Sequence, residues 1–380
     1  MTARDIYLDY NATTPLAEPV FEVMVPFLQT SYGNASSLHY AAREPRRILR
    51  DARRQAAKLL GVANENTLIF TSGGTESNNA VLRSVLLTTG KRRIVTSQVE
   101  HSSILKPLLQ LEKEGCEVLR LPVDQDGQLD MEALENALTP ETALVSLMAA
   151  NNETGVFFDI DAISKRVHDK GILFHVDAVQ SIGKSPINLD NASIDFLSLS
   201  GHKFYGPKGV GILYVRSGRD FIPLINGGSQ ERGRRGGTEN IAGIAGLGKA
   251  CELIQSEVCH EAVRLGEIRQ TFENRLCQEN ADVEIVGAKS VRLPNTSLAL
   301  FQGADAEALL YALDGEGIAC SSGSACMSGS REPSHVLTAM GYNKAQALSA
   351  IRFSFGRYTS LDELEYTLEM IQKILPRLRA

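Results

Sequence analysis

The chain has 380 residues, with 39 lysines and arginines against 45 aspartates and glutamates, and its formal charge at pH 7 is -6. This acidic balance argues against a general nucleic-acid binder or a protein of anionic membrane surfaces, and no apolar run approaches the roughly 18 residues of a membrane-spanning helix. The amino-terminal residues lack a signal-peptide pattern and 6 cysteines are too few for a disulfide scaffold, so we expect a soluble cytoplasmic protein with no nucleic-acid or membrane partner.

From residue 67 onward, short apolar segments typical of buried strands alternate with amphipathic segments typical of helices. Helical patterns include Ser103–Glu114 and Met131–Ala137. The alternation predicts an α/β fold with a mainly parallel central sheet that is covered by helices on both faces. The expected strands are Thr67–Thr71, Arg93–Ser97, Glu117–Leu121, Ala143–Met148, Ile172–Val176, Asp195–Leu199 and Val210–Val215.

A long helical pattern, Gly243 to about Gln278, follows these strands and reads as a connector. A second set of segments comes after it, with a strand expected at Thr296–Phe301 and helices at Ala306–Glu316 and Leu361–Leu378. We therefore expect a large domain over residues 15–255 and a smaller α+β domain made of residues 1–14 and 256–380. The sequence contains no internal repeat or low-complexity tract.

A glycine-rich turn, Ser-Gly-Gly-Thr-Glu-Ser-Asn at residues 72–78, follows the first of these strands and leads into a helix. The backbone N–H groups around Gly74 and Thr75, together with the positive end of the helix, would suit a phosphate. The turn lacks the Gly-Lys-Ser/Thr of a nucleoside triphosphate loop. Taken alone, an ordinary capped turn explains the same residues.

Other polar residues also follow predicted strands, and the carboxyl ends of such strands are where ligands bind in open α/β sheets. His101, Asn152, Asp177 and Gln180 each lie just beyond a strand. A histidine at such a place is more often structural. An aspartate is different, because a carboxylate at the end of an apolar strand is costly to bury without a partner.

A lysine stands in the segment Ser-Gly-His-Lys at residues 200–203, after a buried strand and before a Gly-Pro turn. When Lys203 is partly desolvated it can lose its proton and act as a nucleophilic amine. In an isolated motif a surface lysine is the commoner alternative. The other strand-end residues favour the reactive lysine.

Together these residues meet the needs of pyridoxal phosphate. That cofactor needs a lysine for its aldehyde, an acid for its ring nitrogen and an anion cradle for its phosphate. It also gains from a flat group over the ring and a donor to its phenolic oxygen. The residues that supply these parts are Lys203, Asp177, Gly74 with Thr75, His101, and Asn152 or Gln180.

Nearly the whole chain resembles the cysteine desulfurases of the NifS/IscS type, which are class V aminotransferase-like enzymes of the fold-type-I pyridoxal phosphate group. The similarity runs from YLDYNATTP at residues 7–15 to IRFSFGR at residues 351–357. Its most specific part is SSGSAC at residues 321–326, followed by EPSHVL at residues 332–337. The resemblance implies bound pyridoxal phosphate and removal of sulfur from L-cysteine, which gives L-alanine and a persulfide on Cys326.

The resemblance also implies a role for each matching residue, with sulfur chemistry at Cys326, Lys203 and His101. The implied roles are Lys203 as the Schiff-base lysine, Asp177 on the ring nitrogen, His101 over the ring, Asn152 and Gln180 on the phenolic oxygen, Gly74, Thr75, Ser200 and His202 at the phosphate, Thr238 lent to that phosphate across a homodimer, and Asn34 with Arg352 on the substrate carboxylate.

Cys326 lies among serines, glycine and alanine, as expected for a sulfur carrier that must move between partners. A buried, inert cysteine is the alternative. The spacing of Cys320 and Cys326, with only His335 near, is atypical of zinc. The only metal role that the resemblance implies for Cys326 is that of a transient iron–sulfur ligand. The implied partner is an iron–sulfur scaffold or another sulfur acceptor. Relatives often carry Thr and Leu where this chain has Met327 and Arg331, which would alter acceptor docking.

Three alternatives stay open. Another enzyme on the same cofactor, such as an aminotransferase or a selenocysteine lyase, would use the same lysine. A non-catalytic scaffold is disfavoured because Lys203, Asp177 and Cys326 are all present. Nucleic-acid binding by an arginine-rich helix at residues 43–54 is disfavoured because apolar residues such as Leu49 and Ala52 give that helix a core face.

Overall fold

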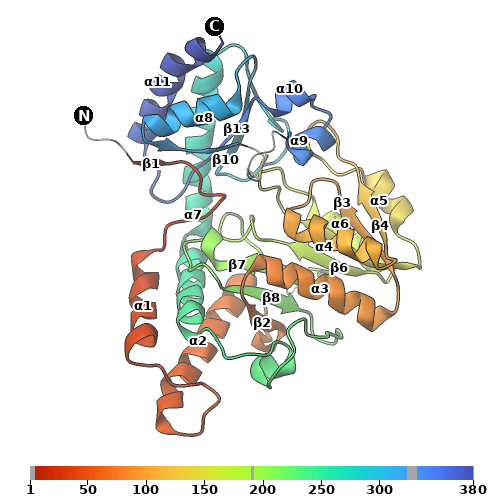
Figure 1. Cartoon of the computed structure of the whole chain (residues 1–380). Helices are drawn as coiled ribbons and strands as arrows, with labels where there is room; N and C mark the ends of the chain where they lie inside the picture. Colours follow the sequence, from red (N-terminus) through yellow and green to blue (C-terminus); the bar gives the residue numbers. More distant parts are fainter. Residues whose placement is uncertain (1–4, 190–191, 323–331, 380) are drawn as a thin grey trace.

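The computed structural model describes residues 5–189, 192–322 and 332–379 (Figure 1). Cys326, and with it the catalytic and metal-ligand roles predicted for that residue, lies outside the described residues.

A seven-stranded sheet forms the centre of the larger part of the chain, with strand order β2-β8-β7-β6-β5-β3-β4. The five strands β3 to β7 run parallel, and β8 pairs antiparallel with both β2 and β7. The predicted mainly parallel sheet is therefore confirmed. The strands are β2 (Leu68–Thr71), β3 (Arg93–Ser97), β4 (Glu117–Leu121), β5 (Thr142–Met148), β6 (Leu173–Asp177), β7 (Phe196–Ser200) and β8 (Gly211–Val215).

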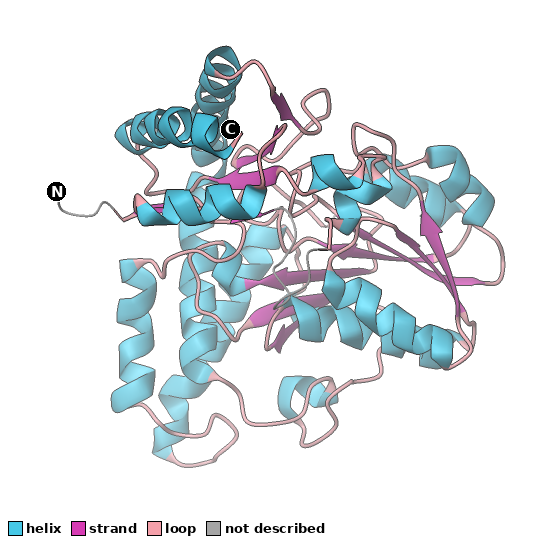
Figure 2. Cartoon of the chain, turned by 45° about the horizontal axis from the view of Figure 1, so that its top comes forward, coloured by secondary structure: helices cyan, strands magenta, loops and turns pink. Residues whose placement is uncertain are grey.

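Helices cover both faces of this sheet (Figures 1 and 2). Successive side chains of a strand point to opposite faces. In β5, accordingly, Leu144 packs in a cluster with Val81 and Leu108, whereas Val145 packs in another cluster with Val167. The helices between the strands are α3 (Gly74–Thr89), α4 (Ser102–Lys113), α5 (Met131–Ala137) and α6 (Ile160–Asp169).

Three further helices pack together beside the sheet, α1 (Glu18–Gln29), α2 (Arg43–Leu60) and α7 (Ile241–Glu279). The predicted connector is α7, which runs alongside both parts of the fold (Figure 1). Close contact with α2 requires a glycine, because a Cβ on Gly248 would lie 2.5 Å from Cα of Ala52. Arg53 of α2 is buried and forms an ion pair of 2.6 Å with Glu231.

The other strands build a four-stranded antiparallel sheet, ordered β12-β13-β10-β9, and a parallel pair of β1 with β11. Phe272 of α7 packs here against Phe353 and Phe355. The strands are β1 (Ile6–Tyr7), β9 (Val283–Ile285), β10 (Thr296–Phe301), β11 (Ile318–Ala319), β12 (Ser321–Ser322) and β13 (Ala350–Ser354), and the helices are α8 (Ala306–Gly315), α9 (His335–Ala339), α10 (Lys344–Ala347) and α11 (Leu361–Leu378). No helix in the described part of the chain is both long and apolar enough to span a bilayer.

Candidate active site

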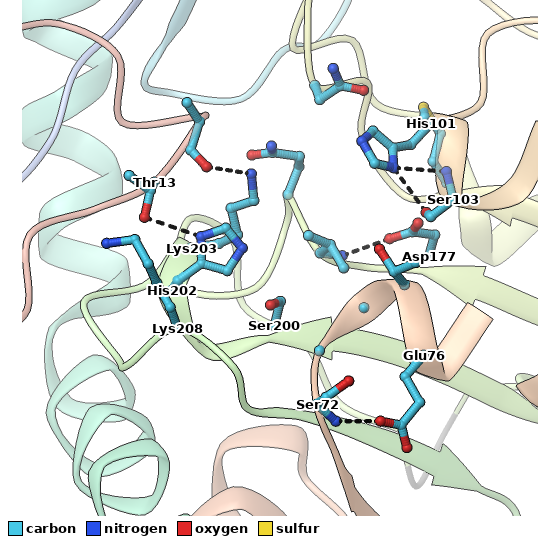
Figure 3. A pocket seen from close by; sticks show the side chains of 18 of the residues that line it. Thr13, Ser72, Glu76, His101, Ser103, Asp177, Ser200, His202, Lys203 and Lys208 are labelled. Atoms are coloured by element: carbon cyan, nitrogen blue, oxygen red, sulfur yellow. Dashed lines mark hydrogen bonds between the residues drawn. The ribbon is translucent and has the colours of Figure 1, made fainter. Parts of the chain in front are cut away.

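A cavity of about 530 Å³ lies where β5, β6 and β7 end, and the start of α3 and residues 12–13 complete its wall. Figure 3 shows His202 and Lys203 at one side of it and His101 with Asp177 at the other. Most of the cofactor residues predicted from the sequence are brought together here. Those lining the cavity are Gly74, Thr75, His101, Asn152, Asp177, Gln180, Ser200, His202 and Lys203.

The glycine-rich turn forms one end of the cavity. The chain passes Gly73 with φ of +148° and enters α3 at Gly74, where a Cβ would lie 2.5 Å from Cγ2 of Val179. The turn is held by Glu76, which accepts a hydrogen bond from the backbone N–H of Ser72 at 2.8 Å. Because the first N–H groups of a helix have no intrahelical partner, they are available to an anion at this end.

Asp177 ends β6 and is only 6% exposed. One carboxylate oxygen accepts from Nδ2 of Asn78 at 2.7 Å, and the other accepts from the backbone N–H of Val179 at 3.0 Å. Asn78 also donates to Ser103 at 2.9 Å. A carboxylate has about four acceptor positions, so Asp177 keeps the capacity to accept a further N–H from a group in the cavity.

His101 caps α4 and is fixed through one ring nitrogen. Its Nδ1 accepts from the backbone N–H of Ser103 at 3.1 Å, and the neutral ring therefore carries its proton on Nε2. Burial lowers the pKa of His101, and the charge of Lys203 lowers it further while Asp177 acts in the opposite sense. The imidazole is thus mainly neutral at pH 7.

Lys203 follows β7, and its Nζ atom donates to the backbone carbonyls of Asn11 at 2.6 Å and Ala12 at 2.9 Å. Burial lowers the pKa of Lys203 to about 8, with a further lowering by Arg352. Its neighbour His202 has a pKa lowered to about 4, mainly by burial. At neutral pH the site therefore holds a neutral imidazole beside a lysine that readily releases its proton.

Asn11 is the centre of a buried network below Lys203. Its carbonyl oxygen accepts from Nε2 of Gln180 at 2.9 Å, and its Oδ1 accepts from Nζ of Lys184 at 2.9 Å. Lys184 also donates to Oε1 of Gln180 at 2.8 Å. Nδ2 of Asn11 donates to the carbonyl of Asn152 at 3.2 Å. The amides of Gln180 and Asn152 thus reach the cavity from a network that the amino-terminal segment joins.

The residues predicted to bind the substrate carboxylate, and the residue predicted to reach the phosphate site of a second subunit, do not line this cavity. Arg352 is buried and held by Oδ1 of Asp9 at 2.7 Å and by the carbonyl of Asn152 at 2.9 Å. Asn34 is exposed and accepts from the backbone N–H of Ser36 at 2.8 Å. Thr238 is also exposed. A single chain therefore brings together most of the residues predicted to bind the cofactor, but its cavity does not include Asn34, Thr238 or Arg352.

Two buried carboxyl groups stand behind the site. Glu100, next to His101, accepts from Ser97 at 2.7 Å and has a pKa raised to about 8 by burial. Glu153 accepts from the hydroxyl of Ser334 at 2.6 Å, and burial raises its pKa to about 7. His335 approaches the carbonyl of Glu100 at 3.0 Å. The segment that begins α9 is thus hydrogen-bonded to the wall of the site.

Sequence reasoning overlooked several residues of this site. Asn78 orients Asp177, and Ser103 orients His101, through side-chain contacts that no local sequence pattern predicts. For Lys184 the sequence did offer one indication: the residue lies four positions after Gln180, which brings it within reach of that side chain. No group of three or more potential metal ligands occurs among residues 5–189, 192–322 and 332–379.

The donor set fits pyridoxal phosphate. The cavity volume lies in the range of small-molecule sites, an amine of lowered pKa and a carboxylate with spare acceptor capacity both face it, and a glycine turn at a helix start offers N–H groups. A side chain larger than hydrogen at Gly74 would close that turn, since its Cβ would lie 2.5 Å from Val179. Lys203, Asp177 and the start of α3 are the residues that would hold the cofactor.

Comparisons with known proteins agree with this geometry. The family model described as aminotransferase class-V matches residues 6–367. Cysteine desulfurase IscS of Dictyoglomus turgidum is 47% identical over 378 residues, which are 99% of this chain and 96% of that protein.

Two solved structures have the same fold. A NifS-like protein superposes with a TM-score of 0.93 at 38% identity, covering 99% of this chain and 100% of its own. SspA in complex with cysteine superposes with a TM-score of 0.83 at 35% identity, covering 93% of this chain and 100% of its own.

Proposed function

Because the chain belongs to the aminotransferase class-V family, we propose that it is a pyridoxal phosphate-dependent cysteine desulfurase. The reaction takes sulfur from L-cysteine, releases L-alanine and leaves a persulfide on Cys326. The observation that carries the proposal is the placement of Lys203 and Asp177 on one cavity, with the pKa of Lys203 lowered to about 8. The cysteine desulfurase of Dictyoglomus turgidum supports the choice of substrate.

When bound, pyridoxal phosphate withdraws electrons from the substrate carbon that it activates. Asp177 would keep the ring nitrogen protonated, because its carboxylate is fixed by Asn78 and Val179 and has the capacity to accept a further N–H. Lys203 would hold the aldehyde carbon of the cofactor. His101 would lie against the ring, Asn152 and Gln180 would hold the phenolic oxygen, and the Gly74 turn with Thr75, Ser200 and His202 would hold the phosphate, since all of these residues line one cavity.

Lys203 and His101 move protons. The amine of Lys203, once the amine of the substrate has taken its place, removes the proton from the α-carbon of the substrate. Its pKa of about 8 leaves about a tenth of it unprotonated at pH 7, far more than the ordinary value of 10.5 would leave. His101 exchanges a proton with the substrate thiol through Nε2, because its Nδ1 is occupied by the N–H of Ser103.

Arg352 and Asn34 bind the substrate carboxylate. A guanidinium binds a carboxylate through parallel hydrogen bonds, and Arg352 already makes a hydrogen bond to the carboxylate of Asp9. The incoming carboxylate competes with Asp9 for this guanidinium. Substrate binding therefore frees Asp9 from Arg352.

Cys326 receives the sulfur. Its thiolate attacks the sulfur of L-cysteine, a sulfur–sulfur bond forms and the carbon–sulfur bond breaks, and the carbon takes the electron pair and then a proton. The products are L-alanine and a persulfide on Cys326. A sulfur-acceptor protein, such as a scaffold for iron–sulfur clusters, takes the terminal sulfur, and Cys326 is a transient ligand of the cluster during that transfer.

We place the enzyme in the cytoplasm as a homodimer. A reducing compartment keeps the thiol of Cys326 available, and Thr238 of each subunit completes the phosphate site of the other. The exposure of Thr238 and its absence from the wall of its own chain's cavity support this arrangement, because the side chain is left accessible to a second subunit.

We also propose a division into a large domain of residues 15–255 and a small domain of residues 1–14 and 256–380. Along α7, Val258 still belongs to the apolar cluster of the seven-stranded sheet, whereas Leu265 packs with the four-stranded sheet. That change within one helix, between residues 258 and 265, lies close to the proposed boundary and supports it.

Mass spectrometry after incubation with L-cysteine tests the function. The peptide that contains Cys326 should gain the mass of one sulfur atom while L-alanine accumulates. L-serine, which has oxygen in place of sulfur, and Cys326→Ala protein are the controls. Failure of Cys326 to gain sulfur, with normal cofactor content, would contradict the proposal.

A further inference from the structure

A second buried lysine lies beside the cavity and takes no part in the reaction described above. Lys184 is 7% exposed. Burial lowers its pKa well below the ordinary value, and the positive charges of Lys203 and Arg352 lower it further. A buried lysine among positive neighbours is costly, so its two hydrogen bonds are of particular interest.

The first hydrogen bond fixes the amide of Gln180. Nζ of Lys184 donates to Oε1 of Gln180 at 2.8 Å, which turns Nε2 towards the carbonyl of Asn11 at 2.9 Å. If the amide were rotated by half a turn, Oε1 would face the Asn11 carbonyl and two acceptors would meet. Because Nε2 carries two hydrogens, one N–H remains for the cavity that Gln180 lines.

The second hydrogen bond fixes Asn11. Oδ1 of Asn11 accepts from Lys184 at 2.9 Å and from Nδ2 of Asn295 at 3.1 Å. The backbone carbonyl of the same residue accepts from Lys203 at 2.6 Å. Lys184 therefore contacts Gln180 and also Asn11, the residue whose carbonyl joins the amine of Lys203 to Gln180. Lys184 does not itself line the cavity.

We propose that Lys184 is a positioning residue, which holds Gln180 so that it presents an N–H, rather than a carbonyl oxygen, to the phenolic oxygen of pyridoxal phosphate. The proposal rests on the proposed function. Lys184 lies four residues from Gln180, and its hydrogen bonds to Asn11 and Gln180 supply the orientation. Its effect is exerted through hydrogen bonding.

The charged groups around the network bear on any titration of the site. Lys203 and Arg352 disfavour a charge on Lys184, and Lys184 in turn helps to lower the pKa of His202. Asp9 and Asp177 favour a charge on Lys203. A test must therefore separate the loss of a donor from the loss of a positive charge.

The test uses the cofactor-loaded protein with Lys184→Met, which keeps most of the length of the side chain and removes the donor. We expect the dissociation constant for pyridoxal phosphate to rise about fivefold to tenfold, as for one lost hydrogen bond of about 1 kcal/mol. We also expect the midpoint of the pH titration of visible absorbance to rise by roughly one pH unit or less, because the anionic phenolic oxygen loses a donor. Ser181→Ala is the matched control, since Ser181 is buried on the same turn and its hydroxyl donates to the carbonyl of Ala178.

Two further variants make the test decisive. In a Gln180→Ala background, Lys184→Met should add no further change of the midpoint, because coupled residues give non-additive effects. Lys184→Gln is neutral and needs no extra volume, and its amide N–H should keep the midpoint close to that of the wild type. This variant also tests the proposal if Lys184→Met does not fold.

An unchanged midpoint in folded Lys184→Met would overturn the proposal. So would an equal change in the Gln180→Ala background, or a change in Lys184→Gln as large as in Lys184→Met, because either result would assign the effect to charge. A wild-type protein that binds no pyridoxal phosphate would instead overturn the proposed function.

Discussion

The Nζ atom of Lys203 lies 2.6 Å from the backbone carbonyl oxygen of Asn11, which precedes it by 192 positions in the chain. This contact joins the segment after β1 to the end of β7, and it holds the amine at the wall of the cavity. The pKa of Lys203 is lowered to about 8, first by burial and then by Arg352. The amine is thus both oriented and partly unprotonated before any ligand binds.

The capture of pyridoxal phosphate by apo-protein should follow this pKa. Only the unprotonated amine attacks an aldehyde, so the capture rate should rise with pH and level off above about 8. Arg352→Gln should move the profile to higher pH, because it removes a positive charge that lowers the pKa of Lys203. Stopped-flow absorbance measures the rate. Lys203→Ala should show no covalent capture, and Lys170→Ala at a surface ion pair with Glu135 should match the wild type. A profile that still rises well above pH 8 would contradict the lowered pKa.

Asp177→Asn should lower kcat on the order of 10²-fold, because a neutral amide no longer keeps the cofactor ring protonated. The measurement is steady-state release of L-alanine, with cofactor content determined in parallel. Asp195→Asn is the matched control, since Asp195 is also buried, accepts from the backbone N–H of Phe174 at 2.9 Å and lies outside the cavity. The Asp195→Asn variant should lose stability but retain kcat within about twofold. Equal losses of kcat in the two variants would contradict the role of Asp177 at the cofactor ring.

Glu100 should make the protein less stable as the pH rises. Its pKa in the folded state is about 8, above the ordinary value of 4.5, so the folded protein binds this proton more tightly than the unfolded chain does. The free energy of unfolding should therefore fall between pH 4.5 and pH 8 on account of this group. Glu100→Gln should remove that dependence and be more stable than the wild type above pH 8 by a few kcal/mol, because each pH unit between the two pKa values contributes about 1.4 kcal/mol. Urea denaturation at a series of pH values measures it, and parallel curves for both proteins would contradict the assignment.

The two neighbouring cysteines should behave differently. Cys326→Ala should retain the visible absorbance of the cofactor but release neither sulfide nor L-alanine above background. Cys320→Ala should remain close to the wild type, because burial raises the pKa of the Cys320 thiol and little thiolate forms. Alkylation followed by peptide mapping identifies the persulfide. Activity that depends on Cys320 and not on Cys326 would show that Cys320, and not Cys326, is the nucleophile.

Mixed dimers test whether the phosphate site is shared. Subunits with both Thr238→Ala and Lys203→Ala are combined with wild-type subunits, so that in the heterodimer the only reactive lysine sits in the site that lacks the donated threonine. Cofactor retention there should match that of the Thr238→Ala homodimer, weaker than the wild type by about 1 kcal/mol. Retention equal to the wild type, or a fully active monomer in light scattering, would rule out the shared site.

Much of the fold follows from local sequence patterns. The strands β3 and β4 and the helix α5 begin and end at the residues that the apolar periodicity predicts, because a strand or helix buries its own face whatever its distant neighbours are. The sequence also indicated that His101, Asp177 and Lys203, the residues predicted to bind the cofactor, would lie close together. Each stands at or just beyond the end of a strand, and parallel strands end at one edge of their sheet.

The contacts between distant segments were decided only by the tertiary structure. Arg352 is joined to Asp9 across 343 positions, Ser334 to Glu153 across 181, and Lys184 to Asn11 across 173. No periodicity within a segment specifies such pairs, because each depends on how the four-stranded sheet and the amino-terminal segment pack against the ends of the large sheet. Composition and spacing therefore determined which chemical groups this protein has at the ends of its strands. Packing determined which of these groups are held by hydrogen bonds, which lose their charge and which face the cavity.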